Sequence, residues 1–446
     1  MFEPPEPSTV TAGEILGTDW VGWPWGEILE VSLDSPAAGP LTDPLSLRID
    51  GWIVGASKAA RNVTALIHPY PPDGLPLLNM PVSFVRQDVL ARFADLRANA
   101  PTGFGTILST AGLPRRFEIS LEARFDDGSV ERFARVRGTH EPIDTGFKPA
   151  LHPLMVTSLG RTGTTWLMRL LAKHPQIAVY DAYPYEARAS TYWLHAFDVL
   201  AEPSDSGLAD KDGFHLDRTA VRNNPLYESC WGDSLALGWL RGEYVIQAAQ
   251  FAQKATEGFY KMVAARNGCS DPCCFAEKFH VGRGRWIARS LYPGASEIVL
   301  VRDPRDVFCS ILAFNDKRNT VGFGRQEVTS DQEFVGTVGL DFTRLLSVLD
   351  EDPDGIHLVR YEDLVTEPIR TLEGVVENAG LDASTAIIRR MLEEAARDAP
   401  ELVLHRTSAD VRSSIGRWRT DLPPELQDHC NVSFAAIVER LGYEPA

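Results

Sequence analysis

The sequence predicts an α/β fold with a parallel sheet flanked by helices, preceded by a smaller N-terminal antiparallel β-sandwich. From about residue 153 onward, short apolar runs alternate with helical patterns, which is typical of parallel strands covered on both faces. Between residues 41 and 140, polar and apolar residues alternate in runs broken by turn residues, which is typical of an antiparallel sheet with one polar face. The length of 446 residues is enough for both domains.

The elements of the first domain follow from local patterns. We expect residues 1–40 to be irregular, because they are rich in Pro, Gly and Trp without clear periodicity. Residues 41–140 form the expected sandwich, and its clearest signal is a hairpin in which two alternating runs meet at Asp127-Gly128. Residues 141–152 contain several Pro and Gly residues and are predicted to be a linker, which leaves 153–446 for the α/β domain.

The α/β domain shows three predicted strands, each followed by a helix. Between the first and second of these units, residues 186–270 are helical and aromatic and carry no strand signal. The strands are predicted at residues 154–158, 297–302 and 356–361, and the helices at 165–173, at 304–314 and from about 367.

The composition excludes several functional classes. Hydrophobic residues make up 44% and charged residues 24% of the chain, which is typical of a globular protein. The formal net charge of −17 repels nucleic acids and anionic membranes, although a local basic pocket can still hold a small anion. No signal peptide and no run of about 20 apolar residues is present, so we expect a cytoplasmic protein without a membrane span.

The cysteines do not predict a metal site. Cys269, Cys273 and Cys274 form the one cluster, and no second pair at zinc spacing accompanies it. We therefore expect reduced thiols and no bound metal.

A glycine-containing turn between the first strand and its helix predicts an anion site. Residues 158–166 read Ser-Leu-Gly-Arg-Thr-Gly-Thr-Thr-Trp, so backbone amides and the helix N-terminus point at one place. The glycines let the backbone approach a ligand, the threonines add hydroxyl donors, and Arg161 adds a charge. A kinase P-loop would need a lysine at a different spacing. A plain turn with capping threonines is the alternative.

A second segment offers a charge and a hydroxyl. Arg302 stands at a strand end, and Ser310 lies two turns into the following helix, so both can converge on one phosphate. The alternative is a helix N-terminus capped by Asp303 and Asp306 beside an incidental arginine.

Taken together, the two segments resemble those of sulfotransferases that use 3′-phosphoadenosine 5′-phosphosulfate (PAPS). Three further segments match that family in the same order, and the resemblance covers roughly residues 152–443. They are Glu-Lys-Phe-His at 277–280, Tyr-Glu-Asp-Leu at 361–364, and Arg-Ser-Ser-Ile-Gly-Arg-Trp at 412–418.

The resemblance implies PAPS as co-substrate, adenosine 3′,5′-bisphosphate as product, and no metal. The first loop would hold the 5′-phosphosulfate, and Arg302 with Ser310 the 3′-phosphate. Arg161 replaces the lysine of the cytosolic branch, and the carboxy-terminal segment lacks that branch's Arg-Lys-Gly. Trp166 either stacks on adenine or is a buried helix aromatic. The implied nucleotide-binding residues are Arg161, Thr162, Gly163, Thr164, Thr165, Trp166, Arg302, Ser310, Tyr361, Arg412, Ser413 and Ser414.

The same resemblance implies catalytic residues. Sulfuryl transfer needs a cation at the leaving phosphate oxygen and a base for the acceptor proton. Lys278 is the implied cation. His280 matches the base of the cytosolic branch, whereas Glu186 matches the carboxylate of other branches, with Asp181 as a second carboxylate option. The sequence does not decide between His280 and Glu186.

The acceptor is predicted from weaker signals. The first domain resembles a bacterial sandwich module found beside glycosyltransferases, which implies a carbohydrate or glycan-precursor acceptor; a packing or oligomerisation domain is the alternative. The residues that carry this likeness are Gly51-Trp52, 85–89, Gly103-Phe104 and Asp127-Gly128. Aromatic residues of the helical insertion either line an acceptor cleft or form core: Trp193, Tyr227, Trp231, Trp239, Tyr244, Phe251, Phe259 and Tyr260.

Two other classes of function stay open. A nucleotide or small-molecule kinase would share the strand–loop–helix cradle but needs a P-loop lysine and an acidic Mg²⁺ ligand. A non-catalytic glycan-binding protein on the same scaffold would have no use for Lys278 beside two phosphate motifs.

Overall fold

A computed structural model of the chain describes residues 13–22, 24–41, 45–68, 70, 74–93, 95–201, 243–352, 355–397, 407 and 411–445. The chain divides into two compact units. The first contains Met1–Phe147 and Leu194–Phe251, and the second contains Lys148–Trp193 and Ala252–Ala446. Each unit has its own sheets and its own buried core.

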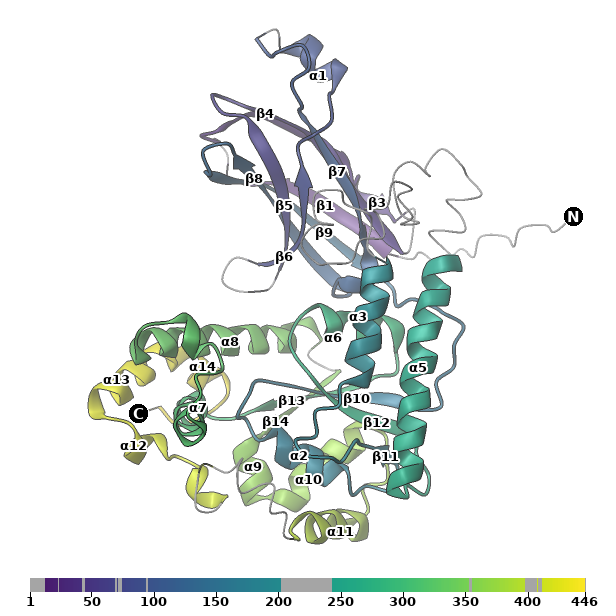
Figure 1. The fold of residues 1–446 in the computed structure, drawn as a ribbon, viewed down its shortest axis with the longest axis vertical. Coiled ribbons are helices and arrows are strands. Elements are labelled where there is room, and N and C mark those ends of the chain that lie inside the picture. Colours follow the sequence, from purple (N-terminus) through teal and green to yellow (C-terminus); the bar gives the residue numbers. More distant parts are fainter. Residues whose placement is uncertain are drawn as a thin grey trace, which may run out of the picture. The chain divides into compact units, whose positions relative to one another are not determined.

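The first unit is built from two antiparallel sheets, as predicted (Figure 1). One has the strand order β3-β1-β9-β8-β5-β6 and the other β2-β4-β7. The rings of Phe104 and Phe133, one from each sheet, meet edge to face with centroids 6.2 Å apart. The elements are β1 (Gly13–Trp20), β2 (Ile28–Ser35), β3 (Gly39–Pro40), β4 (Ser46–Gly55), β5 (Ala60–His68), β6 (Leu75–Pro81), α1 (Gln87–Arg92), β7 (Gly103–Ser109), η1 (Thr110–Gly112), β8 (Arg116–Phe125) and β9 (Val130–His140).

Residues 13–40 differ from the expected irregular segment. β1 pairs with β9 in the larger sheet, and β2 pairs with β4 in the smaller one. Ile15, Ile28 and Val31 are buried. The period-two signal of this segment is weak because both strands are irregular: β1 carries a bulge between Ile15 and Gly17, and β2 shifts register twice against β4.

The predicted hairpin is confirmed. β8 and β9 pair in antiparallel fashion on either side of Asp127-Gly128. Gly128 has a φ of 87°, which favours glycine, and the Asp127 carboxylate accepts a hydrogen bond from the backbone N–H of Ser129 at 2.9 Å.

The second unit contains the predicted parallel sheet with helices on both faces. Its strand order is β11-β12-β10-β13-β14. Its elements are β10 (His152–Ser158), α2 (Thr164–Leu171), β11 (Ile177–Ala178), β12 (Cys274–Phe279), α6 (Arg283–Leu291), β13 (Ser296–Val301), α7 (Pro304–Arg318), η4 (Arg325–Glu327), α8 (Asp331–Glu351), β14 (Ile356–Arg360), α9 (Tyr361–Thr366), α10 (Pro368–Asn378), α11 (Thr385–Ala395), η6 (Arg412–Ser414), α12 (Trp418–Asp421), α13 (Pro424–Ser433) and α14 (Ala435–Arg440). Two more helices, α3 (Ala189–Ala201) and α5 (Tyr244–Asn267), have residues in both units.

The apolar strands bury both of their faces. In β13, Ile298 and Leu300 belong to a core shared with α2, α10 and α11. Val299 and Val301 belong to a second core shared with α7, α8, α13 and α14. Alternate residues of one strand therefore reach opposite layers of helices, which explains the continuous apolar runs in the sequence.

The topology brings three strand ends together. β10 lies between β12 and β13, and all three run in the same direction, so the segments that follow them meet at one edge of the sheet. Crevices outside the carboxyl ends of parallel strands are the usual ligand sites of such sheets. The predicted motifs lie at the ends of these strands: 158–166 begins at the last residue of β10, 277–280 covers the last residues of β12, and 302–310 follows β13.

Two boundaries differ from the prediction. α7 continues to Arg318, beyond the predicted end at Phe314, and the short helix α9 stands between β14 and α10. Tyr361 is therefore the first residue of a helix and not the last of a strand.

Candidate active site

The loop after β10 makes a tight turn into α2. Arg161 and Gly163 both have left-handed backbone conformations, with φ of 68° and 100°. A Cβ at Gly163 would lie 2.4 Å from Cδ2 of Tyr361, so only glycine allows this approach. The buried hydroxyl of Thr162 donates to the carbonyl of Leu159 at 2.9 Å and fixes the turn from inside.

The two predicted anion-binding segments meet in space. Nε of Arg161 donates to Oγ of Ser310 at 3.1 Å. Nη1 of Arg302 donates to the carbonyl oxygen of Arg161 at 3.4 Å. Both Arg302 and Ser310 are buried. The loop after β10 and the segment 302–310 are therefore in direct contact, which the sequence alone did not show.

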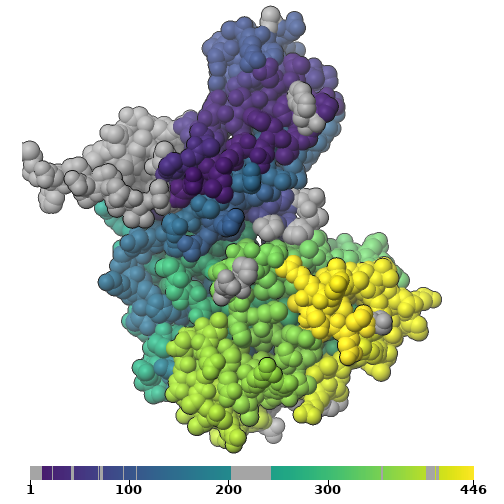
Figure 2. Space-filling view, turned by 180° about the vertical axis from the view of Figure 1, so that it is seen from behind, coloured from purple at the N-terminus to yellow at the C-terminus, as the bar shows by residue number. Residues whose placement is uncertain are grey.

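The carboxy-terminal segment packs against Arg302 and Tyr361. Nη2 of Arg302 donates to the carbonyl of Ser414, and its guanidinium lies 4.8 Å from the centre of the Tyr361 ring. The hydroxyls of Tyr361 and Ser414 are 3.0 Å apart. Arg412 and Ser413, which the resemblance places at the nucleotide with Ser414, are exposed. Figure 2 shows the carboxy-terminal part of the chain, in yellow, on the surface of the second unit.

Asp306 holds the carboxy-terminal segment in place. Its carboxylate accepts hydrogen bonds from the backbone N–H of Gly416 at 2.7 Å and of Trp418 at 3.0 Å. Asp303 serves as the N-cap of α7 and accepts from the N–H of Arg305 at 2.9 Å. The capping role that the sequence allowed for these acidic residues thus coexists with the proposed binding role of the arginine that precedes them.

Arg417 and Thr407 were missing from the sequence prediction. Nη1 of Arg417 donates to Oγ1 of Thr407 at 3.0 Å, and that hydroxyl is 3.3 Å from Oγ of Ser310. Arg417 stands inside the matched carboxy-terminal segment, so its charge was a usable signal. Thr407 carries no sequence signal, because only the fold brings it to α7.

The guanidinium groups raise the local positive potential. Burial, then Arg302, and further Arg318 and Arg417 lower the pKa of Arg161 to about 10, although Tyr183 acts in the opposite direction. Nε of Arg302 is buried and has no hydrogen-bond partner among the residues described. A concentration of positive charge with an unused buried donor is suited to an anion with several oxygens.

Lys278 forms a second centre, at the end of β12. Nζ is buried and donates to Oε1 of Glu186 at 3.1 Å and to the carbonyl of Pro184 at 3.0 Å, and it lies 3.4 Å from Oγ1 of Thr165. Burial lowers the pKa of Lys278, and Glu186 counteracts part of that effect. The ammonium group therefore lies between the first loop and the Glu186 carboxylate.

Both candidate bases lie near this lysine. The side chain of Glu186 is 45% exposed, so a ligand can reach its free oxygen. His280 follows directly after β12 and is exposed to solvent. Nearby protein still desolvates the imidazole and lowers its pKa, and Arg188 lowers it further. Asp181 is engaged elsewhere, since its carboxylate accepts from Nη2 of Arg266 at 2.6 Å.

The remaining predicted residues differ in their burial: some are half-buried, some belong to the core and some are exposed. Thr164 is half-buried at the start of α2, and Trp166 is half-buried and packs against the core beneath that helix. Tyr260 is fully buried, stacks on Phe275 at 4.2 Å and donates to Glu277, so it belongs to the core. Phe251 is 59% exposed. Tyr227, Trp231 and Trp239 lie outside the described residues.

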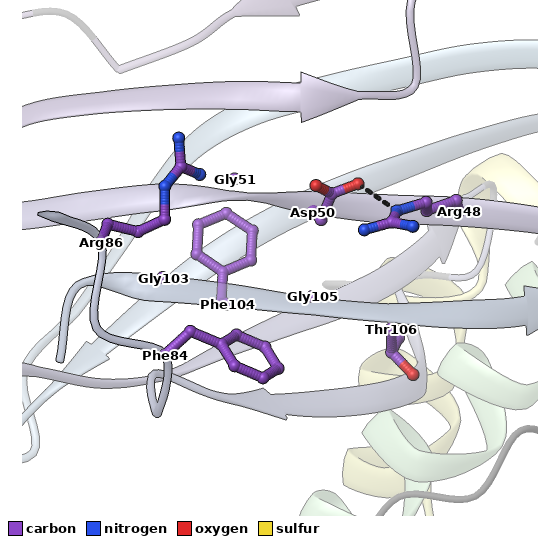
Figure 3. A pocket seen from close by; sticks show the side chains of 9 residues that line it. All are labelled: Arg48, Asp50, Gly51, Phe84, Arg86, Gly103, Phe104, Gly105 and Thr106. Carbon is purple, nitrogen blue, oxygen red and sulfur yellow. Dashed lines mark hydrogen bonds and ion pairs between the residues drawn. The ribbon is translucent and has the colours of Figure 1, made fainter. Parts of the chain in front are cut away.

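The sandwich unit carries a separate hollow of about 190 Å³ (Figure 3). Its floor includes the backbone of Gly103 and Gly105, and Phe84 and Arg86 lie beside the pair formed by Arg48 and Asp50, with Nε to Oδ1 at 2.7 Å. Phe84 is 42% exposed. Segments that carried the module likeness, including Gly51, Arg86 and Gly103-Phe104, meet at this hollow.

Metal and membrane features are not found in the described parts of the chain. No three His, Cys, Asp or Glu side chains are grouped so as to hold a metal ion among those residues. None of the helices described is long and apolar enough to cross a membrane.

Comparison with known proteins gives one family. A family model described as "Sulfotransferase family" matches residues 153–385. Carbohydrate sulfotransferase 1 of Rattus norvegicus and of Homo sapiens are each 28% identical to this chain over 160 residues, which is 33% of this chain and 39% of the relative. The match thus spans well under half the length of these curated relatives.

Solved structures of low sequence identity were also found. The sulfotransferase domain from the curacin biosynthetic pathway has 17% identity and a TM-score of 0.41, and covers 67% of this chain and all of that domain. Mouse sulfotransferase SULT7A1 complexed with PAP has 13% identity and a TM-score of 0.35, and covers 66% of this chain and 87% of that one.

Proposed function

Because the chain belongs to the sulfotransferase family, we propose that it transfers a sulfuryl group from PAPS to a hydroxyl or amine of an acceptor. The observation that carries this proposal is the contact between the loop after β10 and the Arg302–Ser310 segment, with Lys278 at the other side of the loop. A doubly phosphorylated nucleotide needs two such centres of positive charge.

The residues fit the nucleotide. The unused buried Nε of Arg302 and the positive potential around Arg161 are suited to a phosphate. Gly160 and Gly163 have no side chains, and the rings of Phe323 and Tyr361 lie against them. The loop leads directly into the N-terminus of α2, where backbone N–H groups can donate to an anion. A kinase reading is disfavoured because the loop carries no lysine.

The chemistry assigns a task to each centre. PAPS supplies an activated sulfuryl group when it is bound. Lys278 would stabilise the negative charge that develops on the leaving phosphate oxygen, because an ammonium group in a water-poor site acts strongly there. Glu186 or His280 would accept the proton of the acceptor. The threonines of the loop would orient the donor by hydrogen bonds.

The proposed acceptor is a carbohydrate or a glycan precursor. The named relatives are carbohydrate sulfotransferases, and this supports the class of acceptor without identifying it. The hollow of the sandwich unit offers paired donors and acceptors beside an exposed aromatic ring, which suits a neutral hydroxyl-rich molecule. Incubation of the purified protein with radiolabelled PAPS and a panel of sugars tests this directly; labelled product from no sugar in the panel would argue against it.

Donor binding is tested separately. We expect calorimetry to detect adenosine 3′,5′-bisphosphate, whereas a protein that binds ATP and not the bisphosphate would be a kinase-like alternative. Arg302→Ala should raise the KM for PAPS roughly 10- to 100-fold, because a charge-assisted hydrogen bond contributes about 1.5–3 kcal/mol. Arg370→Ala, whose side chain on α10 is 85% exposed, is the matched control and should leave KM unchanged. An unchanged KM in Arg302→Ala would contradict the proposal.

A further inference from the structure

We propose that Glu277 is a positioning residue for the transfer step: it anchors the first turn of α3 and so holds Glu186 beside Lys278. This inference rests on the proposed function, in which Lys278 is the cation and Glu186 a candidate base. Glu277 stands in a motif from which the sequence prediction took only Lys278 and His280 as catalytic residues.

The carboxylate of Glu277 is buried at the start of α3, where it is 1% exposed. One of its oxygens accepts from the N–H of Ser190 at 2.8 Å and from the hydroxyl of Tyr260 at 2.6 Å. The other accepts from the N–H of Thr191 at 2.9 Å and from its hydroxyl at 2.6 Å. The first N–H groups of a helix have no partner within the helix, and negative charge is favourable there. The carboxylate therefore fixes the beginning of α3.

The chain crosses from one face of the parallel sheet to the other before α3. Glu277 and Lys278 are consecutive residues of β12, so their side chains lie on opposite faces. Tyr185 packs in the same core as the even-numbered residues of β12, which share the face of Lys278. Ala189 packs against the core around Phe275, which shares the face of Glu277. The crossing therefore takes place between Tyr185 and Ala189, past the end of β12.

Two neighbouring side chains of β12 hold the two ends of this crossing segment, residues 184–191. Nζ of Lys278 donates to the carbonyl of Pro184 at 3.0 Å and to Oε1 of Glu186 at 3.1 Å. Glu277 holds the other end, at the first turn of α3. Because the side chain of Glu186 is half-exposed, its position depends on the backbone that these two contacts fix.

Loss of the anchor would let Glu186 move away from Lys278. Each carboxylate oxygen of Glu277 serves one N–H group of α3. An amide NH₂ group cannot accept from an N–H, so Glu277→Gln deprives one of these groups of its acceptor whichever way the amide is turned. The ammonium group would then lose part of the influence of Glu186, which favours its charged form.

The protonation of Lys278 can be measured without an acceptor. Reductive methylation of the full chain with labelled formaldehyde over a series of pH values, followed by peptide mass spectrometry, gives the pH midpoint of this amine. Glu186→Gln should lower the midpoint, because Glu186 favours the ammonium form. Glu277→Gln should lower it in the same direction. Arg188 and His280 also lie near the amine, and both variants leave them in place.

The double variant separates positioning from a direct effect of charge. If Glu277 acts through Glu186, Glu277→Gln should cause no further shift of the midpoint in the Glu186→Gln background. An equal further shift would mean that Glu277 acts on Lys278 by its own charge, and this would overturn the inference, as would an unchanged midpoint in Glu277→Gln alone. Glu257→Gln is the matched control, because Glu257 accepts from the N–H of Ala150 just before β10, and it should leave the midpoint unchanged.

Kinetics give a second readout. With labelled PAPS and a sugar that the wild type sulfates, Glu277→Gln should reduce kcat by about 10- to 100-fold, because the base is misplaced. The KM for PAPS should change by less than about 3-fold. In the Glu186→Gln background the same substitution should cause no further loss of kcat. A loss that is equal in both backgrounds would show a merely structural role and overturn the inference.

A milder variant guards against misfolding. Thr191→Val removes one hydroxyl donor to Glu277 and keeps the buried carboxylate, so it should shift the midpoint and kcat in the same directions by smaller amounts. Far-UV circular dichroism and thermal unfolding check that each variant is folded, and Thr191→Val decides the question if Glu277→Gln is not. Absence of sulfuryl transfer by the wild type would refute the proposed function, whereas the titration of Lys278 would still test the anchor.

Discussion

Lys278 is the proposed catalytic cation of the site. Its ammonium group is buried, contacts the first loop through Thr165, and pairs with Glu186. Burial lowers its pKa below the usual 10.5, so the charged form is lost at lower pH than in an exposed lysine. A catalytic cation must be charged, and this ties activity to pH.

We expect Lys278→Ala to reduce kcat by about 10²–10³, with the KM for PAPS changed by less than about 3-fold. In the wild type, kcat should fall as the pH rises through the lowered pKa of Lys278, because deprotonation removes the charge. Lys278→Arg should move this alkaline limb to higher pH, since a guanidinium stays protonated. A full pH–rate profile of the three proteins measures this; an alkaline limb that is identical in Lys278→Arg would assign it to another group.

The base is the second question at the scale of residues. Glu186 lies beside Lys278 and keeps an exposed oxygen, so we expect Glu186→Gln to reduce kcat by about 10²–10⁴. His280→Ala should reduce it less than 10-fold. Asp181→Asn is a matched carboxylate control, because Asp181 pairs with Arg266, and it should keep wild-type turnover. A larger loss in His280→Ala than in Glu186→Gln would reverse the assignment, and an acidic limb below pH 6.5 that disappears in His280→Ala would identify the imidazole.

At the scale of elements, the segment after α7 is fixed against the first loop. Asn315 holds Gly322 at both backbone groups: its Nδ2 donates to the Gly322 carbonyl at 3.3 Å, and its Oδ1 accepts from the Gly322 N–H at 3.2 Å. The neighbouring Phe323 ring consequently lies over Gly160, where an added Cβ would be 2.5 Å from Cε1. A side chain at Gly160 would therefore require the Phe323 ring to move.

Gly160→Ala should lower the free energy of unfolding by about 1–3 kcal/mol, the usual cost of overpacking. Phe323→Ala removes the obstructing ring, so the double variant should lose less than the sum of the two single variants. Chemical denaturation of the four proteins gives the coupling energy. Strict additivity would show that the two residues do not touch in solution.

At the scale of the molecule, one buried ionic group connects several elements of the second unit. Glu297 of β13 accepts from Arg285 of α6 at 2.6 and 2.9 Å, from Arg289 at 2.9 Å and from Thr157 of β10 at 2.6 Å. Arg285 also pairs with Glu351 of α8. Burial opposes ionisation of Glu297, but Arg285 and the other donors outweigh it and lower its pKa.

Glu297→Gln should destabilise the protein by about 3–5 kcal/mol, because the buried Arg285 guanidinium loses one of its two carboxylate partners and Arg289 loses another. A lowered carboxyl pKa adds stability above the unfolded value of about 4.5, and that stability is lost as the pH falls below it. The acid destabilisation of the variant should therefore be shallower than that of the wild type. Urea denaturation between pH 3 and 7 measures both effects, and parallel pH curves would contradict them.

The sequence determined the class of each domain, and it also predicted the residues of the proposed donor site. Strands buried on two faces have continuous apolar runs, and strands buried on one face alternate with period two. Both types of sheet, parallel and antiparallel, were therefore predictable from local pattern. The residues of the loop after β10, Arg302, Ser310 and Lys278 were predicted because each stands in a matched motif at the end of a strand of the parallel sheet. β1 and β2 were missed because their bulges and register shifts interrupt the alternation.

Only the tertiary structure decided which of these groups touch. Strand order places the ends of β10, β12 and β13 side by side, and nothing in the linear order of the chain specifies that neighbourhood. Contact of Arg161 with α7, pairing of Lys278 with Glu186, and the approach of Thr407 to Ser310 join residues far apart in the chain. Local patterns report how a segment buries its own apolar surface, whereas the direction of a charged side chain depends on partners that the fold supplies.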